Sequence, residues 1–309
     1  MTSVVTGAAG FIGRALAQHL VERGEHVIAI DRRPQPPLPA APVAGRLTVL
    51  TADLTSDDAA VRAALADADQ VYHLAGCPGV RDRAADVEAR RQRDNIDATA
   101  AVLAAVPLRT PLVVTSSSSV YGGSAHGRPS AEDQPLRPRG GYARSKAAAE
   151  RLCLQRLEAG GVVAVARPFT VAGEHQRPDM AISLWLAGAR AGLPLRVLGS
   201  PDRTRDITDV RHAAQALVDL ADRETSGLVN IGTGAGHTLR DLVTAVAHAL
   251  DTEVRTLVEP AHPAEVTDTL ADTRRLRRLV GWAPTTDLPD LIARQAAAAE
   301  APAPLAVPA

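Results

Sequence analysis

The chain has 309 residues, of which 46% are hydrophobic and 22% charged, and its formal net charge is −1. This length can form one large or two modest domains, and the balanced charge argues against binding to nucleic acids or membrane surfaces. Two cysteines, Cys77 and Cys153, exclude a disulfide scaffold and a cysteine-based zinc site, and we predict no metal site. With only two Phe, three Tyr and two Trp residues, the core must be built from Ala, Leu and Val.

Neither end of the chain suggests a membrane protein. The N-terminus enters an apolar run at once, without the basic segment of a signal peptide. No apolar stretch approaches the ~20 residues of a membrane-spanning helix, so we predict a cytoplasmic location. Residues 299–309 are mostly Ala and Pro, a composition that predicts a disordered tail.

Short β-branched runs alternate with longer segments rich in Ala, Leu and Arg. Predicted strands occupy residues 3–6, 26–30, 47–51, 70–74, 112–116 and 162–167. Predicted helices occupy residues 11–23, 58–66, 90–105 and 143–159. This alternation is typical of an α/β fold, in which a doubly wound parallel sheet carries helices on both faces.

The alternation becomes less regular from about residue 172, where prolines begin to interrupt it. We therefore predict a sheet domain over residues 1–171 and a smaller C-terminal α/β lobe, mainly for substrate binding, over residues 172–298. Strands near 205–209 and 228–231 are candidates to return to the sheet or its edge.

Three glycines, Gly7, Gly10 and Gly13, lie between the first predicted strand and the first predicted helix. In a dinucleotide site the first permits a tight turn, the second lets the backbone approach a pyrophosphate, and the third allows close helix–strand packing. The helix N-terminus adds free N–H groups and a positive dipole end. Because strand and helix both flank the loop, it indicates a Rossmann-type dinucleotide-binding domain rather than a structural turn.

Acidic residues follow the second and third predicted strands. Asp31 can accept hydrogen bonds from the adenosine ribose hydroxyls and would repel a 2′-phosphate, which favours NAD over NADP. Arg32 and Arg33 could instead pair with such a phosphate. Asp53-Leu54 fits a contact to the adenine edge, and a helix-capping aspartate is an equal alternative.

Tyr142 and Lys146 are four residues apart in a predicted helix, so they share one face. A neighbouring ammonium favours the phenolate and lowers the pKa of the tyrosine, which suits it to act as a base. Lys146 can also hold the nicotinamide ribose hydroxyls. Upstream, Ser117 lies in a serine run at the end of a predicted strand, where its hydroxyl can bridge a substrate hydroxyl to the tyrosine. A polar loop and a surface helix are the alternatives, but the order of these motifs after the glycine loop favours catalysis.

With these motifs and the segment Val120-Tyr121-Gly122, the chain resembles the extended short-chain dehydrogenase/reductase family, which includes NAD-dependent sugar-nucleotide epimerases and dehydratases. The resemblance reaches to about residue 287. It implies that Ser117 is the catalytic hydroxyl, Tyr142 the base and Lys146 its partner, and that the protein is a homodimer. NAD⁺ contacts are implied for Gly7, Gly10, Phe11, Ile12, Gly13, Asp31, Arg32, Asp53, Leu54, Leu74, Ala75, Gly76, Asn95, Tyr142, Lys146 and Pro168.

Residues 167–173 (RPFTVAG) and 176–181 (QRPDMA) resemble the motif of UDP-glucuronate 4-epimerases, roughly R-F-F-T-V-Y-G and then G-R-P-D-M-A. Gly79-Val80-Arg81 also resembles that subfamily, although Asp82 replaces the usual aromatic. Dehydratases carry an Asp-Glu pair just after the catalytic hydroxyl, and this chain has Ser118-Ser119 there. The dehydratase alternative is therefore disfavoured.

The resemblance implies interconversion of UDP-glucuronate and UDP-galacturonate through a transient 4-keto sugar, with tightly bound NAD⁺ regenerated in each turnover. Our hypothesis is that the three serines and Thr170 hold the substrate carboxylate in a pose that disfavours decarboxylation. The remaining alternatives are a UDP-glucuronate decarboxylase, another UDP-sugar 4-epimerase, or a non-catalytic NAD-binding regulator. Substrate contacts are implied for Arg81, Ser117, Ser118, Ser119, Tyr142, Thr170, Arg177, Arg205 and Asp268.

Overall fold

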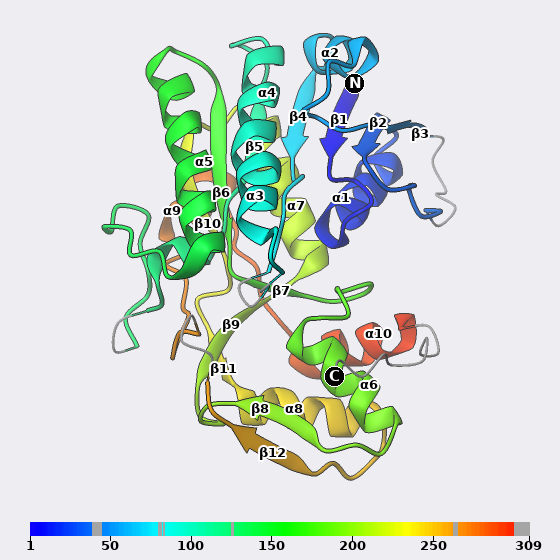
Figure 1. Cartoon of the computed structure of the whole chain (residues 1–309), viewed down its shortest axis with the longest axis vertical. Coiled ribbons are helices and arrows are strands. Elements are labelled where there is room, and N and C mark those ends of the chain that lie inside the picture. The colour runs from blue at the N-terminus through cyan, green and yellow to red at the C-terminus, as the bar shows by residue number, and fades with distance from the viewer. Residues whose placement is uncertain (39–44, 80–81, 83, 125–126, 262–264, 300–309) are drawn as a thin grey trace.

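A computed structural model describes residues 1–38, 45–79, 82, 84–124, 127–261 and 265–299. Its centre is a parallel sheet of seven strands in the order β10-β6-β5-β4-β1-β2-β3 (Figure 1). The predicted strands of the sheet all form, with ends shifted by one residue at most. The strands are β1 (Thr2–Thr6), β2 (His26–Asp31), β3 (Arg46–Thr51), β4 (Gln70–His73), β5 (Leu112–Thr115), β6 (Val163–Pro168) and β10 (Gly227–Ile231).

The middle strands of this sheet are buried along their whole length, and β4 and β5 have no exposed residue. Strands without an exposed face are expected where helices cover both faces of a parallel sheet. One face packs against α1 (Phe11–Glu22), α7 (Val210–Asp222) and α9 (Arg274–Val280). The other face packs against α2 (Ala59–Ala66), α4 (Ala98–Ala105) and α5 (Gly140–Glu158).

The helix predicted over 90–105 is a composite of three pieces. Helix α3 (Val87–Arg91) and α4 are separated by a π-helical segment, Gln92–Asp97. The wider turn buries Asp94 and Asn95, and it points both side chains at loops that follow sheet strands. A π-helical segment of this kind often accompanies a functional site.

The smaller lobe is built from two short sheets and three helices. The three-stranded sheet has the order β11-β9-β7, and the two-stranded sheet pairs β8 with β12. Ile182, Leu195, Ile207, Val246 and Leu291 are members of its apolar core. The elements are β7 (Thr170–Ala172), α6 (Ala181–Arg190), β8 (Leu195–Leu198), β9 (Thr204–Asp209), β11 (Gly236–Thr238), α8 (Leu239–Ala249), β12 (Thr256–Glu259) and α10 (Leu288–Ala298).

The two later strand candidates have different outcomes. The segment near 228–231 joins the large sheet as β10, parallel to β6 at the edge. The segment near 205–209 does not, and this expectation is wrong. Because β10 occupies the place beside β6, β9 pairs instead with β7 in parallel and with β11 in antiparallel fashion.

The proposed division after residue 171 stays a prediction, since α7, β10 and α9 all pack with the sheet domain. The predicted tail lies outside the described residues apart from Ala299. Within the part of the chain that the structure describes, no helix is long and apolar enough to cross a bilayer.

Candidate active site

One continuous cavity of about 1570 Å³ lies between the carboxyl ends of the sheet strands and the smaller lobe. Ligands of open α/β sheets bind at this end of the strands. The volume exceeds the 300–1,000 Å³ of a typical single-ligand site, which is consistent with a dinucleotide and a second ligand together. Of the predicted site residues, these line it: Gly7, Gly10, Phe11, Ile12, Gly13, Asp31, Arg32, Asp53, Leu54, Leu74, Ala75, Gly76, Ser117, Ser118, Ser119, Tyr142, Lys146, Pro168, Thr170, Arg177 and Arg205.

The glycine loop has no room for side chains. Gly7 has a φ of +71°, and a Cβ there would lie 2.6 Å from the Ala75 nitrogen. At Gly13 a Cβ would lie 2.2 Å from the Gly7 carbonyl oxygen, and at Gly10 2.9 Å from the same atom. The loop therefore presents bare backbone at the N-terminus of α1, which fits the pyrophosphate of a dinucleotide.

The acidic residues after β2 and β3 are held in fixed positions. The Asp31 carboxylate accepts hydrogen bonds from the backbone nitrogens of Ala9 (3.1 Å) and Arg33 (2.9 Å). Arg32 pairs with Asp94 at 2.7 Å and with Asp53 at 3.5 Å. Its charge is thus compensated within the protein, which leaves less attraction for a 2′-phosphate and fits NAD.

Asp53 does not cap the next helix, because that role falls to Asp58 at the start of α2. Instead Asp53 accepts hydrogen bonds from the backbone nitrogen and hydroxyl of Thr55. Burial opposes its ionisation, but these hydrogen bonds and the charge of Arg32 hold its pKa below the usual value. The carboxylate therefore stays charged at the rim of the cavity.

The wall formed by Leu74, Ala75 and Gly76 is supported from behind. Asn95 donates to the Cys77 carbonyl (3.1 Å) and accepts from the Cys77 nitrogen (2.8 Å). Asn95 is buried and lies outside the residues that line the cavity, so these bonds support the wall, and its direct contact with the cofactor stays a prediction. A Cβ on Gly76 would lie 2.6 Å from Asn95 Oδ1, so only glycine fits there.

His73 lies deeper, between Thr6 and Thr99. Its Nδ1 is 2.7 Å from the Thr6 hydroxyl and its Nε2 is 3.0 Å from the Thr99 hydroxyl. Burial, with the charge of Lys146, lowers the pKa of His73 to about 3. The ring is therefore neutral and joins β1 to β4.

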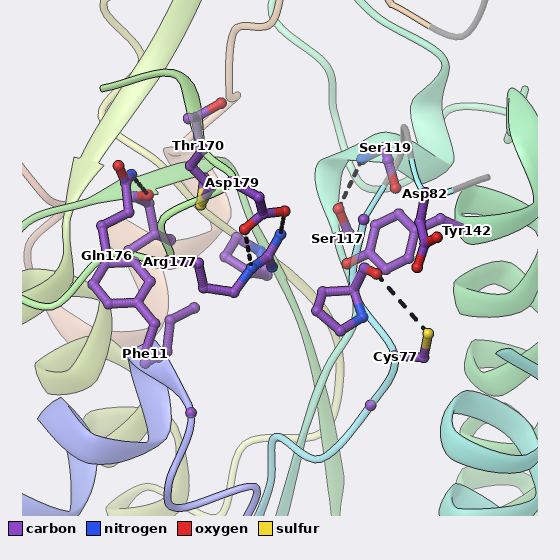
Figure 2. Close-up of a pocket in the computed structure, with 18 of the residues that line it drawn as sticks. Phe11, Cys77, Asp82, Ser117, Ser119, Tyr142, Thr170, Gln176, Arg177 and Asp179 are labelled. Atoms are coloured by element: carbon purple, nitrogen blue, oxygen red, sulfur yellow. Dashed lines mark hydrogen bonds and ion pairs between the residues drawn. The ribbon is translucent and has the colours of Figure 1, made fainter. Parts of the chain in front are cut away.

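Helix α5 presents its proposed catalytic face to the end of β5. Figure 2 shows the Tyr142 and Ser117 side chains facing each other. One turn further on, Lys146 Nζ donates to the Thr115 carbonyl at 2.9 Å. Burial raises the pKa of Tyr142, and the neighbouring Ser117 hydroxyl and the charge of Arg177 oppose this rise. Burial lowers the pKa of Lys146 to about 8.

A buried ionic network, which the sequence analysis missed, lies behind this face. Glu150, one turn after Lys146, accepts hydrogen bonds from Ser116 Oγ at 2.5 Å and from Arg167 at 2.8 and 2.7 Å. Arg167 also donates to the Tyr121 hydroxyl at 2.9 Å. The continuing i, i+4 spacing from Tyr142 through Lys146 to Glu150 was the available signal.

The serine run forms a polar shelf opposite Thr170. Ser117 caps the short 3₁₀ helix Ser118–Tyr121, because its Oγ accepts from the Ser119 nitrogen at 3.1 Å. The Ser119 hydroxyl is buried, and no partner for it is found among the described residues. An orphaned hydroxyl on a cavity wall is a polar group that a ligand can satisfy.

Two arginines predicted to contact the substrate, Arg177 and Arg205, already have partners within the protein. Arg177 makes two bonds to Asp179, at 2.9 and 2.8 Å. Arg205 donates to three backbone carbonyls and pairs with Glu265 at 3.2 Å, so it braces the segment from Glu265 to Thr267. Its side chain nevertheless forms part of the cavity lining.

Asp268 lies outside the residues that line the cavity, and its contact with substrate stays a prediction. Its carboxylate accepts from the nitrogen and hydroxyl of Thr204, at 3.2 and 2.7 Å, and so fixes the start of β9. Arg81 is outside the described residues. Cavity-lining polar residues that were not predicted include Asp82, Arg90 and Gln176. In the described parts of the chain, no group of three or more His, Cys, Asp or Glu residues could hold a metal ion.

Known proteins are similar over nearly the whole chain. UDP-glucose 4-epimerase from Mycolicibacterium smegmatis is 28% identical over 95% of this chain and 97% of its own. The structure titled MoeE5 in complex with UDP-glucuronic acid and NAD has a TM-score of 0.86 and 34% identity, covering 96% of this chain and 98% of that one. UDP-glucuronic acid 4-epimerase from Bacillus cereus, solved with UDP-glucuronic acid and NAD, has a TM-score of 0.87 and 27% identity over 96% and 98%.

Residues 3–232 match the NAD dependent epimerase/dehydratase family. This match spans most of the chain, and the glycine cradle, Asp31 and the compensated Arg32 fit NAD as the cofactor. The protein is therefore an NAD-dependent enzyme with the extended short-chain dehydrogenase/reductase fold, and it belongs to the NAD dependent epimerase/dehydratase family.

Proposed function

We propose that the protein is a UDP-glucuronate 4-epimerase, which interconverts UDP-glucuronate and UDP-galacturonate. The observation that carries the proposal is the polar shelf of Ser117, Ser118 and Ser119 across from Thr170, with one buried hydroxyl unpartnered among the described residues. A neutral sugar has no group that needs so many neutral donors, whereas a carboxylate accepts several hydrogen bonds. The structural similarity to MoeE5 with UDP-glucuronic acid and NAD supports the same substrate.

Tyr142 takes the proton of the C4 hydroxyl in this proposal, with Ser117 hydrogen-bonded beside it. Burial disfavours the phenolate of Tyr142, so the site needs positive charge near that oxygen. Arg177 supplies such a charge. We propose that Lys146, one turn further along the same face of α5, adds to it. Bound NAD⁺ supplies the reversible oxidation at C4.

The carboxylate contacts also protect the substrate. A 4-keto uronic acid is a β-keto acid, and it loses CO₂ when the bond from C5 to the carboxylate aligns with the carbonyl π system. We propose that the serine shelf and Thr170 hold the carboxylate away from that alignment. In a decarboxylase, the same residues would have to hold the carboxylate so that its bond to C5 aligns with the carbonyl π system.

The diphosphate of the substrate is assigned to arginines at the cavity. We propose that Arg177 exchanges part of its pairing with Asp179 for phosphate oxygens, because a guanidinium fork suits both acceptors. Arg205 is proposed to contact the nucleotide while it braces the segment from Glu265 to Thr267. The contact proposed for Arg81 rests on its place in the motif.

A UDP-glucose 4-epimerase is the second candidate. The observation that favours it is Asp82, a carboxylate in the cavity lining that would repel an anionic sugar. Its pairing with Arg90 at 2.7 Å compensates much of that charge, which is why we place the uronate first.

A homodimer and a cytoplasmic location complete the proposal. Small apolar side chains surround a shallow hollow between α4 and α5, and Leu108 there is 46% exposed. A second copy could cover this face by packing helix against helix. The hollow is lined by Ala100, Leu103, Ala104, Leu108, Leu152, Gln155 and Arg156.

The test is to incubate the purified protein separately with UDP-glucuronate and with UDP-glucose, and to identify the products by ¹H NMR. The proposal expects UDP-galacturonate from the first substrate and little turnover of the second. Efficient conversion of UDP-glucose alone would select the second candidate, and a pentose nucleotide with CO₂ would indicate a decarboxylase.

A further inference from the structure

The loop of residues 173–180 joins β7 to α6 and carries Arg177 into the cavity. The last described helix, α10, holds this loop through one buried side chain, Gln295. Its Oε1 accepts from the Gly173 nitrogen at 3.1 Å, and its Nε2 donates to Gln176 Oε1 at 2.9 Å and to Ser183 Oγ at 3.1 Å. One amide thus ties the beginning of the loop, its middle and the following helix together.

Gln176 and Gln295 together form a clamp on the loop, in which Gln176 makes the contacts on the loop side. Its Nε2 donates to the Val171 carbonyl at 2.9 Å, so the amide spans from β7 to α10. Gln176 lines the cavity and is next in sequence to Arg177 (Figure 2). The motif that this segment resembles has glycine at the position of Gln176, so the pairing of the two glutamines is a feature of this chain.

The residue before Gln295 strengthens the same attachment. Arg294 Nη1 contacts both carboxylate oxygens of Glu174, at 2.8 and 2.9 Å, and Arg294 also pairs with Asp209 at the start of α7. Burial opposes protonation of Arg294, yet three carboxylates raise its pKa above the usual value. The loop is therefore attached to α10 at Gly173, Glu174 and Gln176, all within four residues of Arg177.

We propose that Gln295 is a positioning residue for nucleotide binding, which acts by holding Arg177 where it meets the substrate diphosphate. A loop that is already ordered loses less conformational entropy when its ligand binds. The proposal rests on the proposed function only in requiring a nucleotide diphosphate at Arg177, and it does not depend on which sugar is attached.

The test measures the dissociation constants of UDP and of NAD by calorimetry, so it requires no turnover. Gln295→Ala should weaken UDP binding about 5- to 10-fold and leave NAD binding unchanged. Arg177→Ala should weaken UDP binding by about 10-fold or more. The double variant should bind UDP as Arg177→Ala does, because both changes remove the same contact.

Additive losses in the double variant, or an equal loss of NAD binding, would assign Gln295 a general structural role and overturn the proposal. Unchanged UDP binding in Arg177→Ala would overturn it as well. If Gln295→Ala does not fold, Gln176→Ala opens the clamp from the loop side and should give the same selective loss. Gln215→Ala is the matched control and should leave both constants unchanged, since among the described residues Gln215 bonds Asp219 alone, on α7 itself. UDP-glucuronate that binds but is not converted would contradict the proposed function and leave this result standing.

Discussion

Lys146 Nζ donates a hydrogen bond to the carbonyl oxygen of Thr115 at 2.9 Å, and so joins helix α5 to the end of strand β5. The next residue, Ser116, donates from its Oγ to Glu150, one turn after Lys146. Ser117 faces Tyr142, one turn before Lys146. Three turns of α5 thus meet three consecutive residues at the end of β5.

The pKa of Lys146 predicts an alkaline limit to activity. Burial lowers this pKa to about 8, and the amine is charged only below it. The charge stabilises a Tyr142 phenolate, so kcat/KM should fall as the pH rises above about 8. Lys146→Arg should lose this alkaline limb, because a guanidinium stays charged. Lys146→Met should be slower by about 10²-fold below pH 8, and the difference should shrink as the natural lysine loses its charge above that pH. A pH–rate profile of the three proteins decides this, and an alkaline limb that persists in Lys146→Arg would assign it to another group.

The proposed binding of the substrate carboxylate by the polar shelf and Thr170 predicts a change of product. Thr170→Ala and Ser119→Ala each remove a hydroxyl proposed to hold the substrate carboxylate, so each should weaken UDP-glucuronate binding by about 3- to 10-fold. Thr170→Ala should also release pentose nucleotide, because the carboxylate can then align with the C4 carbonyl. Product analysis by ¹H NMR, with UDP-glucose as the control substrate, measures both effects. If the kinetics on UDP-glucuronate are unchanged and no pentose nucleotide is formed, the proposal that these hydroxyls hold the substrate carboxylate is contradicted.

The buried pair Glu150–Arg167 predicts a large effect on stability. Glu150→Leu leaves the Arg167 guanidinium, which is 1% exposed, without its carboxylate and should lower the free energy of unfolding by about 3–5 kcal/mol. The double change Glu150→Leu with Arg167→Leu should recover much of this loss, since no buried charge then remains. Urea denaturation measures these differences. The control is Asp202→Asn, which breaks an exposed pair with Arg240 and should cost less than about 1 kcal/mol. If Glu150→Leu also lowers the free energy of unfolding by less than about 1 kcal/mol, the large effect predicted for the buried pair is contradicted.

Asp31 predicts the choice between NAD and NADP. Removing its charge in Asp31→Asn should weaken NAD binding by about 10-fold and reduce the discrimination against NADP, because the repulsion of a 2′-phosphate disappears. The dissociation constants of both cofactors, measured on cofactor-free protein, test this. Unchanged affinities for both would show that Arg32 and its partners, and not Asp31, determine the preference.

Local sequence patterns were sufficient for the sheet and for the glycine loop. The strands are short runs rich in β-branched residues, and the loop needs glycines for reasons of space that the spacing of its glycines already indicates. The Tyr142–Lys146 pair was also predictable, because helical periodicity alone brings the two residues to one face.

Contacts between distant segments were not predictable in this way. No local pattern indicated that Asp268 fixes Thr204, 64 residues away, at the start of β9. No local pattern indicated that a π-helical turn directs Asn95 to Cys77. Gln295 drew no attention in the sequence, because its partners lie more than 100 residues earlier. These positions depend on tertiary packing, which no local pattern encodes.

The central claim is that C4 of a UDP-uronate is oxidised and reduced again within one site. The most direct measurement is ¹H and ²H NMR of the product formed from UDP-glucuronate labelled with deuterium at C4. The account predicts UDP-galacturonate that keeps its deuterium at C4, because the hydrogen removed from that carbon is held in the site and returned to it. Loss of the label to water, or a pentose nucleotide as the only product, would contradict it.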